Sequence, residues 1–123
     1  MNRNLIALAV LLSSAALRVY AAAGDAAHGE QLYEARCTAC HSLDASRVGP
    51  MHRGVFGRKA GSVPDFDYSP AVKKSKIVWS EKTLDQWLTN PERLIPGQKM
   101  GLQVPDAADR TDLIAFLKRE SGK

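Results

Sequence analysis

The stretch Cys37-Thr38-Ala39-Cys40-His41 dominates the interpretation of this sequence, because it places two thiols and an imidazole at a fixed spacing. On a helical turn, side chains three residues apart project from one face, so both cysteines can reach the two vinyl groups of one porphyrin. His41 follows directly and is placed under the iron, where an imidazole nitrogen can serve as an axial ligand. Cys-x-x-Cys-His is the attachment sequence of haem c, and it predicts one covalently bound haem.

Two other chemistries use closely spaced cysteines, and each needs surroundings that this sequence does not supply. A thioredoxin-like redox dithiol needs a strand before the motif and alternating strands and helices around it. A structural zinc site needs four ligands, usually with a second Cys or His pair, and Cys37 and Cys40 are the only cysteines. Haem attachment is therefore the preferred interpretation, and a catalytic dithiol stays as its rival.

The first 23 residues have the layout of a secretory signal peptide. A positively charged start precedes an unbroken apolar run, Leu5 to Leu12, and Ala21 and Ala23 form an A-x-A cleavage site. The apolar run is too short to span ~30 Å of hydrocarbon. We therefore predict cleavage of residues 1–23, leaving a single domain, residues 24–123, that is exported, soluble and periplasmic, without permanent membrane insertion.

The charge of the chain argues against nucleic acid as a partner. The formal net charge is +4, and the predicted leader removes Arg3 and Arg18. Nucleic-acid binding normally needs a strongly basic face, so nucleic acid is not an expected partner. The predicted haem instead makes redox proteins the expected partners. Arg36, Arg93 and Lys99 are predicted to ring an exposed haem edge, where such charges speed encounter with acidic partners.

An electron-transfer haem needs a second axial ligand, and Met100 is the best-placed candidate. It lies in an irregular stretch rich in Pro and Gly, residues 94–101, which predicts a loop. A methionine carried by a loop can approach the iron from the face opposite His41, whereas Met51 and His52 are expected on the His41 side. Two filled axial positions leave no site for a substrate, so we expect an electron carrier and not an enzyme.

Four helical segments are predicted, and they make the fold all-α. They are expected at about 25–38, 69–75, 80–90 and 106–119, from cap residues and apolar periodicity. The stretch 43–67 shows no strand alternation and is predicted to be a long loop. A loop of this length in so small a domain needs something to fold against, which a haem supplies.

Beyond the haem motif, an ordered series of matches resembles the mitochondrial-type cytochromes c and their bacterial periplasmic relatives, the class I cytochromes c. The matching segments are, in order, 49–50, 54–61, 66–69, 77–79, 83–84, 90–91, 95–100 and 112–117. The resemblance implies a cytochrome c fold, with three to five helices and long loops wrapped around one haem. It also implies a monomer, and a first helix whose Gly29 and Tyr33 pack across Leu113 and Phe116 of the last.

The resemblance further implies roles for individual residues around the haem. Pro50 would accept a hydrogen bond from His41 through its backbone carbonyl. Arg58, Tyr68 and Trp79 would hold a haem propionate, because a buried carboxylate needs charged and polar partners. The implied cofactor-binding set is Cys37, Cys40, His41, Pro50, Arg58, Tyr68, Trp79 and Met100, with His41 and Met100 on the metal.

Several residues near the expected ligands depart from the family pattern. Trp87 stands where a tyrosine is common, Gln98 replaces a threonine, and His52 replaces an apolar residue that packs beside the ligating histidine. A haem c sensor or a peroxidase-like protein with a labile sixth ligand therefore stays open as the alternative function. The resemblance does not identify the electron donor or acceptor, which could be an oxidase, a reaction centre, a cytochrome complex or a dehydrogenase.

Overall fold

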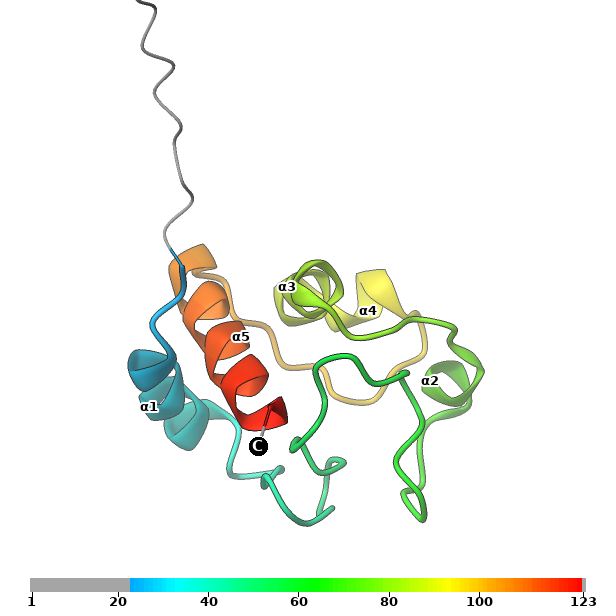
Figure 1. Ribbon diagram of the computed structural model, residues 1–123. Helices are drawn as coiled ribbons and strands as arrows, with labels where there is room; N and C mark the ends of the chain where they lie inside the picture. Colours follow the sequence, from blue (N-terminus) through cyan, green and yellow to red (C-terminus); the bar gives the residue numbers. More distant parts are fainter. Residues whose placement is uncertain (1–22, 123) are drawn as a thin grey trace, which may run out of the picture.

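Five helices and the loops between them make up residues 23–122, the part of the chain that the computed structural model describes (Figure 1). The helices are α1 (Ala26–Arg36), α2 (Pro70–Lys74), α3 (Glu81–Thr89), α4 (Pro91–Leu94) and α5 (Ala107–Ser121). Within the same residues, β-type pairing is confined to an isolated bridge between Lys59 and Val78. The prediction of an all-α fold is confirmed.

The predicted signal peptide lies outside the described residues except for Ala23, so its cleavage stays a prediction. The described range covers the predicted mature domain up to Gly122. Within that range, no helix is both long and apolar enough to cross a lipid bilayer.

The first helix is shorter than the sequence analysis predicted. It begins at an Asp25 cap, whose side chain accepts hydrogen bonds from the amides of Ala27 (3.0 Å) and His28 (3.1 Å). It was predicted to extend to Thr38 but ends at Arg36. The reason is a tight turn at the haem motif, where the amides of residues 40 and 41 both donate to the Cys37 carbonyl.

A short helix, α4, lies where the sequence analysis predicted only a helix end. Asn90 caps the C-terminus of α3, and its side-chain oxygen accepts a hydrogen bond from the Arg93 amide at 3.1 Å. Pro91 occupies the first helical position, where its missing N–H costs nothing. The same Asn-Pro pair therefore ends one helix and begins the next.

The first and last helices cross at a glycine (Figure 1). A Cβ at Gly29 would lie 2.0 Å from the backbone oxygen of Asp112 and 3.0 Å from the Cβ of Phe116, so no larger residue fits. Beside it, the rings of Tyr33 and Phe116 lie 4.9 Å apart, and Leu113 is 1 % exposed. The predicted packing of α1 across α5 is confirmed.

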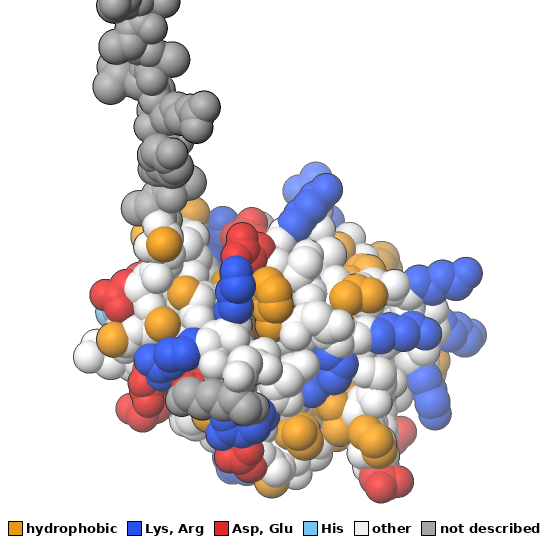
Figure 2. Space-filling model, in the orientation of Figure 1, with side chains coloured by type: hydrophobic (Ala, Val, Ile, Leu, Met, Phe, Trp, Pro, Cys, Tyr) orange, Lys and Arg blue, Asp and Glu red, His pale blue; other side chains and the backbone are white. Residues whose placement is uncertain are grey.

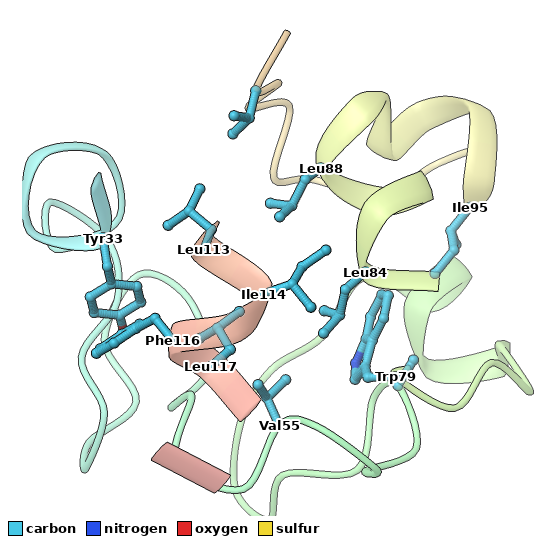
Figure 3. Packing of buried hydrophobic residues seen from close by; sticks show 12 residues of the cluster. Tyr33, Val55, Trp79, Leu84, Leu88, Ile95, Leu113, Ile114, Phe116 and Leu117 are labelled. Carbon is cyan, nitrogen blue, oxygen red and sulfur yellow. The ribbon is translucent and has the colours of Figure 1, made fainter. Parts of the chain in front are cut away.

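The hydrophobic core includes side chains of α1, α3, α5 and the loops, and Figure 3 shows its part between α5 and α3. Leu113, Ile114 and Leu117 of α5 face Leu84 and Leu88 of α3. Burying side chains of this size contributes about 1.5–3 kcal/mol each. The core forms one wall of a cavity that the remaining loops enclose, because Leu84, Leu88, Leu113 and Leu117 also line that cavity.

Candidate haem site

All eight predicted site residues line one cavity of about 320 Å³. The lining includes the end of α1 and the haem motif, the long loop before α2, parts of α3, the segment after α4 and two leucines of α5. Val48 and Leu102 lie at the open rim, with 76 % and 39 % of their surfaces exposed. The fold therefore gathers into one site residues that are spread from Cys37 to Met100 along the chain.

Cys37 and Cys40 form no disulfide, and both lie at the wall of this cavity. Burial raises the pKa of Cys37 to about 11. A redox dithiol works through a thiolate of lowered pKa, and no strand precedes the motif in residues 23–36. The surroundings of Cys37 therefore disfavour the thiolate that disulfide exchange needs, which counts against the rival dithiol.

The imidazole of His41 is held so that one nitrogen is free to bind a metal. Its Nδ1 lies 2.8 Å from the carbonyl oxygen of Pro50, and since a carbonyl can only accept, Nδ1 carries the hydrogen and Nε2 the lone pair. A Cβ at Gly49 would stand 2.1 Å from Cε1 and 2.5 Å from each ring nitrogen, so it would sit over the ring face. Burial lowers the pKa of His41, which favours the neutral form that binds metals.

His52 contacts His41 directly, which the sequence analysis did not predict. The two rings are stacked, with centroids 3.9 Å apart and planes 20° from parallel. The Nδ1 of His52 lies 2.9 Å from the hydroxyl of Tyr33. Burial, and then the nearby His41 and Arg58, lower the pKa of His52 well below its usual value. The only sequence signal was a histidine at a usually apolar position.

Arg58 brings a positive charge to the cavity wall. Its Nη2 donates to the carbonyl of Met51 at 2.8 Å and its Nη1 to that of Arg53 at 3.3 Å, and among residues 23–122 it makes no ion pair. Burial lowers the pKa of Arg58. A half-buried cation with only carbonyl partners would be stabilised by a bound anion. Tyr68 and Trp79 line the same cavity.

Met100 lies on a loop that is anchored at both ends. Ile95 before it is 5 % exposed, and Val104 after it is fully buried. The Ile95 amide donates to the carbonyl of Pro91 at 2.9 Å, and the Val104 amide donates to that of Leu88 at 2.7 Å. Because the ends are fixed to α4 and α3, the loop can present a side chain to the cavity from a defined position.

Gln98 fixes the conformation of this loop from inside. Its Oε1 accepts hydrogen bonds from the amides of Met100 (2.6 Å) and Gly101 (3.0 Å), and its Nε2 donates to Glu92 at 3.1 Å. Glu92 also accepts from the Gly97 amide at 2.9 Å, and these bonds lower the pKa of its carboxyl. Gly97 and Gly101 have φ angles of 91° and 67°, which favour glycine. The departure from threonine at position 98 therefore supports the loop.

These groups fit a covalently bound haem. The cavity offers two cysteines, an imidazole with a free Nε2, a methionine on an anchored loop and a cation that has no carboxylate partner in the described part of the chain. Most of the remaining lining is apolar or aromatic, including Trp87, whose ring lies 5.3 Å from that of Trp79. Such a lining excludes water from a flat apolar macrocycle.

Comparison with known proteins decides the family. The family model described as Cytochrome c matches residues 26–120. The chain belongs to the cytochrome c family. It is a mono-haem electron carrier and not an enzyme, and one haem c is attached through Cys37 and Cys40, with His41 completing the motif.

Relatives of this cytochrome come from both eukaryotes and bacteria. Cytochrome c2 of Rhodomicrobium vannielii is 45% identical over 108 residues, which cover 83% of this chain and 84% of the relative. Cytochrome c of Arabidopsis thaliana is 45% identical over 104 residues, covering 80% of this chain and 91% of the relative. The solved structure of cytochrome cH from Methylobacterium extorquens has a TM-score of 0.75 and 42% identity, covering 78% and 99%. The fold and family predicted from the sequence are confirmed.

The charges at the cavity mouth only partly match the sequence analysis. Arg36 and Lys99 line the cavity, but Arg93 is not among the lining residues. Arg36 also forms an ion pair with Asp109 at 2.9 Å, which offsets part of its charge. Lys99 is exposed and makes no ion pair within residues 23–122.

A cluster of lysines around α2 was missed by the sequence analysis. Lys73 and Lys74 form the last turn of α2, Lys76 follows, and all three are exposed. Figure 2 shows Lys and Arg side chains gathered on the side of the molecule where α2 lies. Helix α2 borders the cavity through Val72. The sequence signal was the presence of three lysines within the four residues 73–76.

Proposed function

We propose that this cytochrome is an exported, periplasmic one-electron carrier whose haem iron is held between His41 and Met100. The observation that carries the proposal is that His41, with its free Nε2, and Met100, on its anchored loop, line the same cavity. When bound there, the haem supplies a reversible one-electron iron couple. A His and Met pair favours the ferrous state more than two histidines do.

The surrounding residues hold and shield the cofactor. Arg58 offsets the charge of a haem propionate, and Tyr68 and Trp79 add polar hydrogens at the same wall. The carbonyl of Pro50 keeps the His41 imidazole in the tautomer that binds iron. Gln98 keeps the Met100 loop in one conformation through the redox cycle, which opposes the alternative of a labile sixth ligand.

Location and partners follow from the sequence and the surface charges. The predicted signal peptide and the haem c motif both support a periplasmic location. The exposed lysines around α2, with Lys99 at the cavity mouth, support docking of an acidic redox donor or acceptor. The chain works as a monomer that meets each partner in turn.

Absorption spectra of the holoprotein test the ligand pair. The protein is made in a cell that matures haem c, and its colour is expected to survive extraction with acid-acetone. The oxidised form is expected to show the weak near-red band of a sulfur-to-iron bond, which Met100→Leu abolishes and Met51→Leu, the matched control, preserves. The His/Met assignment would be overturned if Met100→Leu kept the band. It would also be overturned if carbon monoxide bound readily to the reduced wild type.

Salt dependence tests the docking surface. The rate of reduction by ferrocyanide, a small anionic donor, is expected to fall as ionic strength rises, because salt screens exposed charges. Lys74→Gln should lower the rate at low salt more than Lys118→Gln, which removes the same charge from α5, where it pairs with Glu81. Equal effects of the two substitutions, or a rate independent of salt, would contradict docking beside α2.

A further inference from the structure

A polar pair, Tyr33 and His52, packs against the imidazole of His41. The stacked rings of His41 and His52 and the hydrogen bond between His52 and the Tyr33 hydroxyl form one continuous chain of contacts. We propose that His52, itself held by Tyr33, is a positioning residue that fixes the ring orientation of His41 and the polarity beside it. The proposal rests on the role of His41 as an iron ligand.

His41 needs a contact of this kind because its hydrogen bond fixes only one atom of the ring. The bond from Nδ1 to the Pro50 carbonyl sets the tautomer but leaves the ring free to turn about the hydrogen-bond direction. A second ring only 20° from parallel, at a centroid distance of 3.9 Å, limits that rotation. Gly49 lies against the face of the same ring and limits it further. An aliphatic residue at position 52 would fill space without presenting a flat surface.

His52 can act in this way because it is itself held from two sides. The Tyr33 hydroxyl lies 2.9 Å from its Nδ1, and Tyr33 is 4 % exposed and packed on Phe116 at the helix crossing. Arg58 donates to the carbonyls of the two residues flanking His52, which fixes the backbone there. The orientation of His41 is thus tied to the rigid crossing of α1 and α5.

The polarity of His52 has a consequence for the reduction potential. Oxidation adds one positive charge to the group made by the iron and its ligands. A dipolar imidazole stacked on His41 stabilises that charge better than an aliphatic side chain does, since polarity near the axial ligand is one of the protein's means of setting the potential. Replacing His52 with an apolar residue should therefore raise the potential.

The test compares four holoproteins with the wild type: His52→Leu, Tyr33→Phe, the double variant, and the control His28→Leu. The readouts are the reduction potential and the proton NMR shifts of the haem methyl groups in the oxidised form, which report the orientation of an axial imidazole. We expect His52→Leu to rearrange the methyl shifts and raise the potential, with a smaller change of the same direction in Tyr33→Phe. The double variant should equal His52→Leu, because Tyr33 acts through His52. His28 is exposed on the same helix as Tyr33, and its replacement should change neither readout.

A second variant keeps the test decisive if His52→Leu does not mature. His52→Phe retains a flat ring and loses the hydrogen bond, so its methyl shifts should stay close to the wild type while its potential rises. Methyl shifts and potentials that match the wild type in all His52 and Tyr33 variants would overturn the proposal, as would additive effects in the double variant. If the wild type itself lacks the near-red band, the His/Met assignment fails; if the band is present and the variants are unchanged, only the role of His52 fails.

Discussion

The helix crossing and the cavity wall satisfy their polar groups in different ways. At the crossing, partners come from the chain itself: Asp112 accepts from the Asp25 amide and from His28, both at 2.7 Å. Arg119 of α5 likewise reaches Glu30 of α1 at 2.6 Å. The crossing of α1 and α5 therefore holds its own charges and hydrogen bonds in balance without any cofactor.

The cavity wall, in contrast, carries groups whose natural partner is the haem. Residues 37–69 contain no helix, and their isolated bridge is the Lys59–Val78 pair. This segment contributes the two cysteines, the Nε2 of His41 and the charge of Arg58, which has no ion-pair partner among residues 23–122. The difference indicates that one half of the molecule folds on its own contacts, while the other needs the haem to fold against. The predictions below test that division, beginning with the largest effect.

Removing the haem attachment should cause the largest loss of stability. The loss should be greatest in the half of the molecule that forms the cavity wall. In Cys37→Ser combined with Cys40→Ser, no thioether can form, and we expect loss of most of the free energy of unfolding, which is about 5–15 kcal/mol for a typical domain. Amide hydrogen exchange should show that residues 37–69 lose protection more completely than α1 and α5. Ala39→Ser, a change inside the same motif, should leave the haem attached and the stability intact. Uniform protection across both halves would contradict the division.

The fold was largely predictable from sequence because its signals are local. Cap residues such as Ser80 and Asp106, with apolar side chains at helical spacing, were enough to place α3 and α5. Helix α4 was missed because Asn90-Pro91 is equally a stop signal and a start signal, and local patterns alone do not say which. The early end of α1 depends on backbone hydrogen bonds in the turn at Cys37, which have no sequence signature.

The site was predictable where the family motif or the chemistry fixed a residue, and not where two loops meet. The motif singled out Cys37, Cys40 and His41, the Pro- and Gly-rich loop indicated Met100, and the resemblance added Pro50, Arg58, Tyr68 and Trp79. The stack of His52 on His41, and the hydrogen bonds that Gln98 accepts from two amides of the Met100 loop, lie within irregular segments. Such segments have no periodicity from which a contact can be predicted. The unusual residues at positions 52 and 98 could therefore be recognised in the sequence, but the groups that they contact could not.

Within the crossing, the next effect in size should come from the glycine that lets the helices meet. Gly29→Ala places a Cβ 2.0 Å from a backbone oxygen that cannot move without shifting α5. We expect a loss of about 3 kcal/mol, the upper end for overpacking, measured by urea unfolding. Gly122→Ala is the matched control, because its Cβ would be 3.8 Å from its nearest neighbour. Equal stability of the two variants would show that α1 and α5 can separate without cost.

The buried carboxylate of Glu120 links the two halves. Removing its charge should lower the free energy of unfolding by a moderate amount. Glu120 of α5 is 4 % exposed and accepts from Arg53 of the long loop and from Arg119, both at 3.1 Å. Glu120→Gln should cost about 1–3 kcal/mol, the penalty for an impaired buried hydrogen bond to a charged group. Glu81→Gln removes an exposed ion pair with Lys118 and should cost under about 1 kcal/mol. A smaller loss for Glu120→Gln than for Glu81→Gln in urea unfolding would contradict this link between the halves.

The smallest effect should come from the His28–Asp112 pair at the start of α1, whose contribution to the free energy of unfolding should depend on pH. The hydrogen bond to Asp112, helped by the charges of Asp112, Asp109 and Asp25, raises the pKa of His28. The same bond lowers the pKa of Asp112. A raised histidine pKa gives stability that is complete below the unfolded value of about 6.5 and lost as the pH rises through the folded value. A lowered carboxyl pKa gives stability that is complete above about 3.9 and lost as the pH falls.

The pair should therefore contribute most between about pH 4 and about pH 6.5, where both groups are charged in the folded and unfolded chain. Urea unfolding of the wild type and of His28→Gln at about pH 5 and about pH 8.5 measures this contribution, because the titration of every other group cancels in the difference between the two proteins. The wild type should be the more stable at the lower pH, and its advantage should shrink at the higher pH. An advantage that grew with pH would mean that His28 acts as a neutral hydrogen-bond partner, and that the crossing is held here by geometry rather than charge.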